Sequence, residues 1–202
     1  MVRYFLLGGG FMWPILVLLI AGLAIGIVKM ITLWRAGVNT RKFMERIRTS
    51  LKEGGVDKAL EVCETTRGPV ASILHAGLSR AQEGIEHVEK AISNAAAIEM
   101  AFLEKGMIWL GFIIVVAPLL GFTGTVWGMI LAFEAIKTAN DISPAIVAGG
   151  ISQALLTTLF GLIVAITIQF FYNWATSKID KLIIDMEESS VELVDTLIEM
   201  KK

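Results

Sequence analysis

The sequence predicts an all-α membrane protein with three transmembrane helices, of which the second and third extend far into the cytoplasm. Apolar residues make up 55% of the 202 residues, and the mean hydropathy is +0.69. Segments 4–28, 106–133 and 142–177 each exceed the roughly 20 apolar residues that cross a bilayer as a helix. None of the three contains an Asp or Glu in its interior. This composition excludes an ordinary soluble domain.

The distribution of basic residues predicts the orientation in the membrane. Residues 29–52 carry seven Lys and Arg residues against the single acid Glu45, whereas the connection 134–143 has only Lys137 as a base. By the positive-inside rule, the N-terminus and this connection lie outside. Residues 29–105 and the C-terminal tail then lie in the cytoplasm.

Residues 1–34 are predicted to contain the first membrane helix. Its apolar run is too long for the core of a signal peptide, and no A-x-A-like cleavage site follows it, so we expect it to be retained. Gly22 and Gly26 are four residues apart and would let another helix approach closely.

Residues 35–105 are predicted to form a cytoplasmic region of helices separated by glycine and proline. The pair at 54–55 ends a basic helix, and Gly68 followed by Pro69 begins another. An apolar stripe then starts after Gly84 and continues into the second apolar segment. We therefore expect one unbroken helix from about residue 85 to about residue 135.

Residues 106–177 are predicted to form a two-helix pore region. The short connection between the last two apolar segments makes them antiparallel neighbours. The third segment, with about 36 uncharged residues, is longer than a bilayer requires, which indicates that protein covers its ends. Residues 178–202 are predicted to form an amphipathic cytoplasmic helix. Its apolar stripe needs a partner, either the 85–105 helix or another copy of the chain.

The polar side chains inside the last two segments are mainly hydroxyls and amides. Thr125 and Thr158 are expected at similar central depths, and Gln153 shares a helix face with Thr157. An amide is unfavourable in lipid, so Gln153 should face protein or water. A simpler interpretation stays open, in which Thr side chains bond only their own helix and small residues serve packing. The packing candidates are Pro118, Gly121, Gly124, Gly128 and Gly161.

The sequence carries no signature of catalysis, metal binding or nucleic-acid binding. Cys63 is the only cysteine, which rules out an internal disulfide, and His75 and His87 have no metal-ligand spacing with it. No nucleophile–base pair stands out, and the net charge is −1. We therefore expect a protein that is not an enzyme, uses no cofactor or metal, and binds no nucleic acid.

Four motifs mark the two long segments. The second segment contains APLLG at 117–121 and GTVWGMI at 124–130, and the third contains GGISQAL at 149–155 and TTLFGLIVAI at 157–166. Together with residues 59–78, these motifs resemble the MotA/TolQ/ExbB proton-channel family, in particular its ExbB/TolQ-like branch.

The resemblance implies a subunit of an ion-driven motor in the bacterial inner (cytoplasmic) membrane. A homo-pentamer would surround a single-span ExbD/TolR-like partner whose Asp takes up the ion, with a TonB-like or TolA-like protein as client. Thr125 and Thr158 match the family's pore-lining threonines, and Thr123, Gln153 and Thr157 would lie along the same ion path. The carboxylate that these segments lack would come from the partner.

Three residues depart from the family pattern. Gln153 stands where the family often has Glu, Thr123 replaces an apolar residue, and Thr167 replaces a proline. These departures leave open whether the ion is a proton or sodium, and the sequence leaves the client open as well. A structural scaffold that holds the partner's helix without conducting ions is the alternative, because it fits the missing carboxylates equally well.

Overall fold

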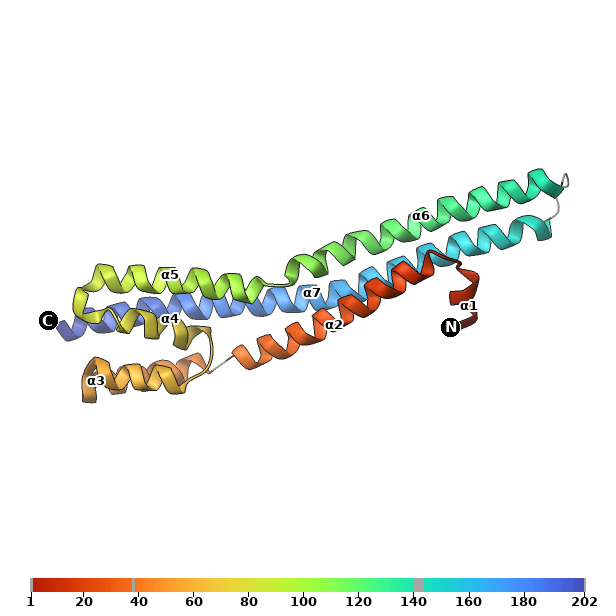
Figure 1. The fold of residues 1–202 in the computed structure, drawn as a ribbon. Coiled ribbons are helices and arrows are strands. Elements are labelled where there is room, and N and C mark those ends of the chain that lie inside the picture. Colours follow the sequence, from red (N-terminus) through yellow and green to blue (C-terminus); the bar gives the residue numbers. More distant parts are fainter. Residues whose placement is uncertain (1, 38, 140–143, 202) are drawn as a thin grey trace. The chain divides into compact units, whose positions relative to one another are not determined.

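In the computed structural model, which describes residues 2–37, 39–139 and 144–201, every regular element is a helix (Figure 1). Three of these helices are long and apolar enough to cross a membrane, which confirms the predicted all-α membrane fold. The helices are α1 Val2–Leu7, α2 Met12–Ala36, α3 Thr40–Thr65, α4 Pro69–Leu78, η1 Ala81–Glu83, α5 Ile85–Glu104, α6 Met107–Ala139 and α7 Pro144–Lys201.

The described residues form two compact units. The first contains the chain up to Lys29 and residues Gly106–Trp174, and the second contains Met30–Lys105 and the chain from Ala175 onward. The long helices α2 and α7 therefore contribute to both. The α7 helix has 58 residues without interruption, well over twice the roughly 20 that a bilayer requires.

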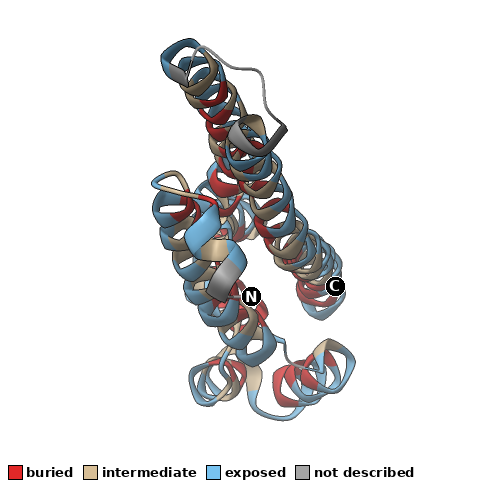
Figure 2. Ribbon diagram, turned by 90° about the vertical axis from the view of Figure 1, so that its right-hand side faces the viewer, coloured by how far each residue is buried: buried red, intermediate tan, exposed pale blue. Residues whose placement is uncertain are grey.

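The core of the first unit is shared by α2, α6 and α7. Ile15 of α2, Leu110 and Ala117 of α6, and Ile168 of α7 belong to one buried apolar cluster. The outward faces of the same helices are also apolar, with side chains such as Phe122 largely exposed. Figure 2 shows the buried positions as stripes along the helices. Apolar side chains on both the inner and outer faces are what a bilayer demands of a spanning helix.

The first apolar segment begins later than predicted. The prediction started it at residue 4, but α2 begins at Met12, after a turn at residues 8–10 that separates it from α1. All three turn residues are glycines, and Gly9 has φ +72°, a conformation that glycine adopts without steric penalty. Average hydropathy remains high across this turn, which is why the segment appeared continuous.

The single helix predicted for residues 85–135 is also wrong. The α5 helix ends at Glu104 and α6 begins at Met107, with Gly106 at φ +93° between them. The Lys105 amide donates to the Phe102 carbonyl oxygen at 3.3 Å, which closes the last turn of α5. One glycine in a left-handed conformation redirects the backbone without disturbing the apolar periodicity.

The predicted breaks in the second unit are confirmed. Gly55, at φ +69° and ψ −162°, interrupts α3, and α4 begins at Pro69. The α4 helix packs closely on α5 because Gly77 has no side chain. A Cβ there would lie 2.6 Å from Cγ1 of Ile92. Ile73 on α4 is fully buried.

The C-terminal half of α7 has the predicted amphipathic stripe. Met186 is buried, whereas Val191 keeps 62% and Ile198 keeps 40% of its surface exposed. These three residues line a groove of about 790 Å³ together with Ile92 and Met100 of α5. The stripe is therefore only partly covered within one chain.

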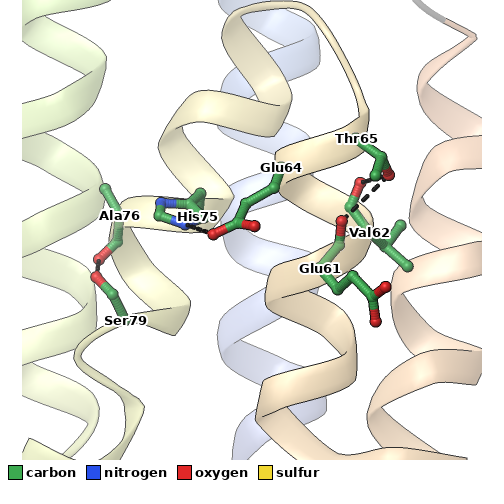
Figure 3. A network of polar contacts seen from close by, with 7 residues as sticks. All are labelled: Glu61, Val62, Glu64, Thr65, His75, Ala76 and Ser79. Carbon is green, nitrogen blue, oxygen red and sulfur yellow. Dashed lines mark hydrogen bonds and ion pairs between the residues drawn. The ribbon is translucent and has the colours of Figure 1, made fainter.

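A polar network joins the end of α3 to α4 (Figure 3). His75 Nε2 lies 3.5 Å from Glu64 Oε1, while the Thr65 hydroxyl donates to carbonyl oxygens of its own helix at 3.1 Å. Next to Glu64 lies the buried Cys63. Burial, with a smaller contribution from the Glu64 charge, raises the pKa of the Cys63 thiol to about 11. The thiol is therefore a poor nucleophile at neutral pH.

Candidate functional site

The contact between α6 and α7 is built on small residues. A Cβ on Gly161 would lie 2.6 Å from the Ala117 carbonyl oxygen, and a Cβ on Gly128 would lie 2.7 Å from that of Gly150. Residues with increasing numbers along α6 contact residues with decreasing numbers along α7, so the two helices are antiparallel, as predicted. Glycine allows this close backbone approach, which is typical of membrane helix pairs.

Thr157 lies inside this contact. Its side chain is fully buried, and its hydroxyl donates to the Ala154 carbonyl oxygen at 2.9 Å. A Cβ on Gly124 would lie 2.6 Å from Thr157 Oγ1, and one on Gly121 would lie 2.8 Å from the Thr157 carbonyl oxygen. The absence of side chains at these two glycines makes room for Thr157 between the helices.

Thr125 and Thr158 form a hydroxyl pair across the two helices. Their Oγ1 atoms are hydrogen-bonded to each other. Thr125 Oγ1 also lies 3.2 Å from the Ala154 carbonyl oxygen of α7, and Thr158 Oγ1 lies 3.2 Å from the Gly121 carbonyl oxygen of α6. Bonding within one helix alone therefore does not describe this pair, which links α6 to α7.

The hydroxyl pair has more acceptors than hydrogens. Thr125 Oγ1 also approaches the Gly121 carbonyl oxygen at 3.2 Å, so two hydroxyl hydrogens serve four contacts. Either threonine can donate to the other, because each hydroxyl carries one hydrogen and accepts as well. Both side chains are half-buried. A half-buried hydroxyl pair can bind a water molecule or a carboxyl group presented from outside the chain.

The structure does not bring Thr123 to this pair. Its side chain is exposed, and its hydroxyl donates to the Leu119 carbonyl oxygen of its own helix at 2.8 Å. Two residues along a helix correspond to about 200° of rotation, so Thr123 and Thr125 point in nearly opposite directions. Thr167 likewise donates to the Ile163 carbonyl oxygen at 2.8 Å. These two threonines therefore fit the simpler interpretation, in which a threonine side chain bonds only its own helix.

Gln153 faces protein, as expected, but its neighbour was not predicted. A Cβ on Gly9 would overlap the Gln153 side-chain amide. The glycine turn before α2 therefore packs directly against α7, one turn from Thr157. The only sequence signal for this contact was the run of three glycines at 8–10, which average hydropathy obscured.

Pro118 lies within α6 and is half-buried. It has no backbone N–H, so the Ile114 carbonyl oxygen lacks its usual helical donor. Pro118 and Thr125 are seven residues apart, about two turns, and therefore lie on the same side of α6. This freed carbonyl adds a second polar position to the side of α6 that carries the hydroxyl pair.

Comparison with known proteins gives consistent matches. Residues 65–188 match the MotA/TolQ/ExbB proton channel family. The chain is 35% identical over 143 residues to a biopolymer transport protein ExbB homolog of Methanothermobacter thermautotrophicus, covering 71% of this chain and 50% of that protein. It is 34% identical over 108 residues to the biopolymer transport protein ExbB of Xanthomonas campestris, covering 54% and 42%.

A Tol-Pal system protein, TolQ of Haemophilus influenzae, is 33% identical over 96 residues, covering 48% of this chain and 42% of that protein. The chain thus spans half or less of the length of these relatives. The family match includes the whole of α4, α5 and α6, and it includes α7 up to residue 188.

Proposed function

Because the chain belongs to the MotA/TolQ/ExbB proton channel family, we propose that it is a subunit of an ion-driven inner-membrane motor of the ExbB–ExbD or TolQ–TolR type. The observation that carries this proposal is the Thr125–Thr158 hydroxyl pair, which joins two apolar segments, 106–133 and 142–177, that contain no acid. Ion transfer through a bilayer usually requires a titratable group. In this proposal a partner supplies it.

The partner would be a single-span ExbD/TolR-like protein whose Asp enters beside the hydroxyl pair. Five copies of this chain would surround it, with the N-terminus in the periplasm and the C-terminus in the cytoplasm. The basic residues that follow the first span support this orientation. The motor would use ion flow to do mechanical work on a TonB-like or TolA-like client. No enzymatic role is proposed.

The proposed roles of the site residues follow their positions. Thr125 and Thr158 would contact the ion or the partner's carboxyl group directly, since their hydroxyls are half-buried and can both donate and accept. Thr157 and Gln153 would position the helices around the pair. Thr123, on the outward side of α6, would act only where another chain packs against it.

The test is removal of the hydroxyls at constant side-chain shape. Thr125→Val and Thr158→Val, separately and together, should reduce ion flux at least tenfold in vesicles that contain the chain and its partner, measured over a range of pH and sodium concentrations. The matched controls are Thr123→Val and Thr167→Val, which remove hydroxyls that bond only to their own helix. These should leave flux near the parent value.

The scaffold alternative makes the opposite prediction. If the chain only holds a partner helix, the double variant should assemble normally and leave any flux and any motor-dependent activity unchanged. Assembly with the partner must be measured alongside flux, because the two threonines also link α6 to α7. Normal assembly together with parent-level flux would reject the proposed ion path.

A further inference from the structure

A cavity of about 700 Å³ lies in the second unit, where α2, α3 and α7 meet. Its walls include Trp34 at the end of α2, Arg41 in the first turn of α3, and Lys178 and Lys181 of α7. The volume lies in the range of small-molecule binding sites. The hydroxyl pair and the ion path proposed above involve none of these residues.

Charges along the α7 wall follow a fixed order. Reading outward from Ser177, the last residue of the uncharged segment, the cavity is lined by two bases and then three acids, which are Lys178, Lys181, Asp185, Glu188 and Glu192. Their spacing of three and four residues puts all five on one helix face. The wall is therefore positive next to the bilayer boundary and negative farther from it.

These charges are not neutralised by one another. Among the described residues, the ion pairs join Arg48 to Glu199 and three other pairs outside the cavity, and none joins two of its charged side chains. Arg41 adds a third base from α3, whose first turn contains no acid. The cavity thus offers unpaired groups of both signs to a ligand.

The cavity also has an apolar edge suited to a lipid. Trp34 lines it and keeps 77% of its surface exposed, and Ile31, one turn earlier on α2, keeps 49%. Tryptophan is enriched at the level of the lipid head groups. An acyl chain could follow the exposed face of α2 while the polar head enters the cavity.

We propose that this cavity binds the head group of an aminophospholipid, with the phosphate at Lys178, Lys181 and Arg41 and the ammonium at Asp185 and Glu188. The order of charges selects this class of lipid. Phosphatidylglycerol carries no cation for the acids to bind. The quaternary ammonium of phosphatidylcholine has no N–H to donate to a carboxylate. An ethanolamine head group supplies both the anion and a hydrogen-bonding cation, in the order the wall requires.

The proposal is tested by native mass spectrometry of the full chain released from detergent. Phosphatidylethanolamine, phosphatidylglycerol and phosphatidylcholine with identical acyl chains are added at equal concentrations. The ethanolamine lipid should be retained several-fold more than the other two. Lys178→Gln/Lys181→Gln should lower its retention about tenfold or more, since each base near a lipid surface contributes to binding.

The matched control is Lys52→Gln/Lys90→Gln, which removes the same charge from exposed positions outside the cavity and should leave retention unchanged. Asp185→Asn/Glu188→Gln should abolish the preference for phosphatidylethanolamine. The variant should still retain phosphatidylglycerol, which a misfolded cavity would not. Equal retention of the three lipids by the parent chain would overturn the proposal. Displacement of the lipid by soluble phosphoethanolamine would also overturn it, because the ligand would then be a free phosphate ester.

Discussion

At the scale of single residues, four threonines of α6 and α7 form two pairs that share a residue type but not an environment. Thr123 and Thr167 bond to carbonyl oxygens of their own helix, whereas Thr125 and Thr158 bond across to the facing helix. A bond within one helix forms equally well when that helix is alone. A bond across two helices fixes their register, so only the second pair couples side-chain chemistry to helix packing.

Gly9 should be among the least replaceable residues of the N-terminal turn. It has φ +72°, and a Cβ there would overlap the Gln153 amide. A left-handed conformation disfavours an alanine by about 1–2 kcal/mol before any steric overlap is counted. We expect Gly9→Ala to lower the thermal midpoint of the detergent-solubilised protein, measured by circular dichroism.

Gly10→Ala is the matched control, because no atom lies within 4 Å of a Cβ at that position. Combining Gly9→Ala with Gln153→Ala should restore part of the lost stability, since the overlap is removed but the backbone conformation remains unfavourable. Equal melting temperatures for the Gly9 and Gly10 variants would show that the glycine turn does not pack against α7 in solution.

At the scale of helices, two adjacent glycines of α7 provide a sharp test of the α6–α7 contact. A Cβ on Gly150 would lie 2.6 Å from the Gly128 carbonyl oxygen, whereas a Cβ on Gly149 would meet nothing within 4 Å. At both positions, alanine favours the helical conformation over glycine by up to about 1 kcal/mol. Gly149→Ala should therefore be neutral or stabilising.

Gly150→Ala should instead destabilise the protein by about 1–3 kcal/mol, because overpacking forces the backbones apart. Chemical crosslinking between cysteines placed on the outer ends of α6 and α7 would report the same separation. If the two alanine variants unfold at the same denaturant concentration, the close helix contact is not present.

How far the helices could be predicted depended on which physical signal each one carried. Hydropathy and the Gly68–Pro69 pair gave the three spans and the start of α4 correctly. The breaks at Gly9 and Gly106 were missed because a single left-handed glycine leaves the apolar pattern intact. The sequence predicted that Thr125 and Thr158 lie at similar depth but not that they bond to each other. The contact between Gly9 and Gln153 joins segments far apart in sequence, which no local pattern encodes.

At the scale of the whole molecule, the orientation proposed for the membrane can be read by labelling. In a Cys63→Ser background, Lys137→Cys lies after the second span and Glu86→Cys lies in the proposed cytoplasmic region, and both positions are exposed. A membrane-impermeant thiol reagent applied to whole cells should modify the first cysteine and not the second. The reverse pattern would place the basic region outside.

The single chain leaves part of its apolar surface uncovered, which indicates that it assembles with other chains. Val191 and Ile198 of α7 remain exposed beside the groove shared with α5, at a position in the sequence beyond the bilayer span. Exposed apolar stripes of this kind mark interaction surfaces. We expect a homo-pentamer in detergent even without the single-span partner, observed by native mass spectrometry. The number five comes from the family, and the exposed stripe supplies only the need for neighbours.

Val191→Asp/Ile198→Asp should shift the pentamer toward monomer, because burying an unpaired carboxylate costs several kcal/mol in a subunit interface. Asn94→Asp on the exposed side of α5 adds a charge without removing an apolar side chain, and it should leave the assembly intact. A parent protein that is mainly monomeric would reject the pentamer. A pentamer that tolerates the double aspartate variant would instead move the interface away from this groove, to the apolar faces of α6 and α7 that the bilayer surrounds.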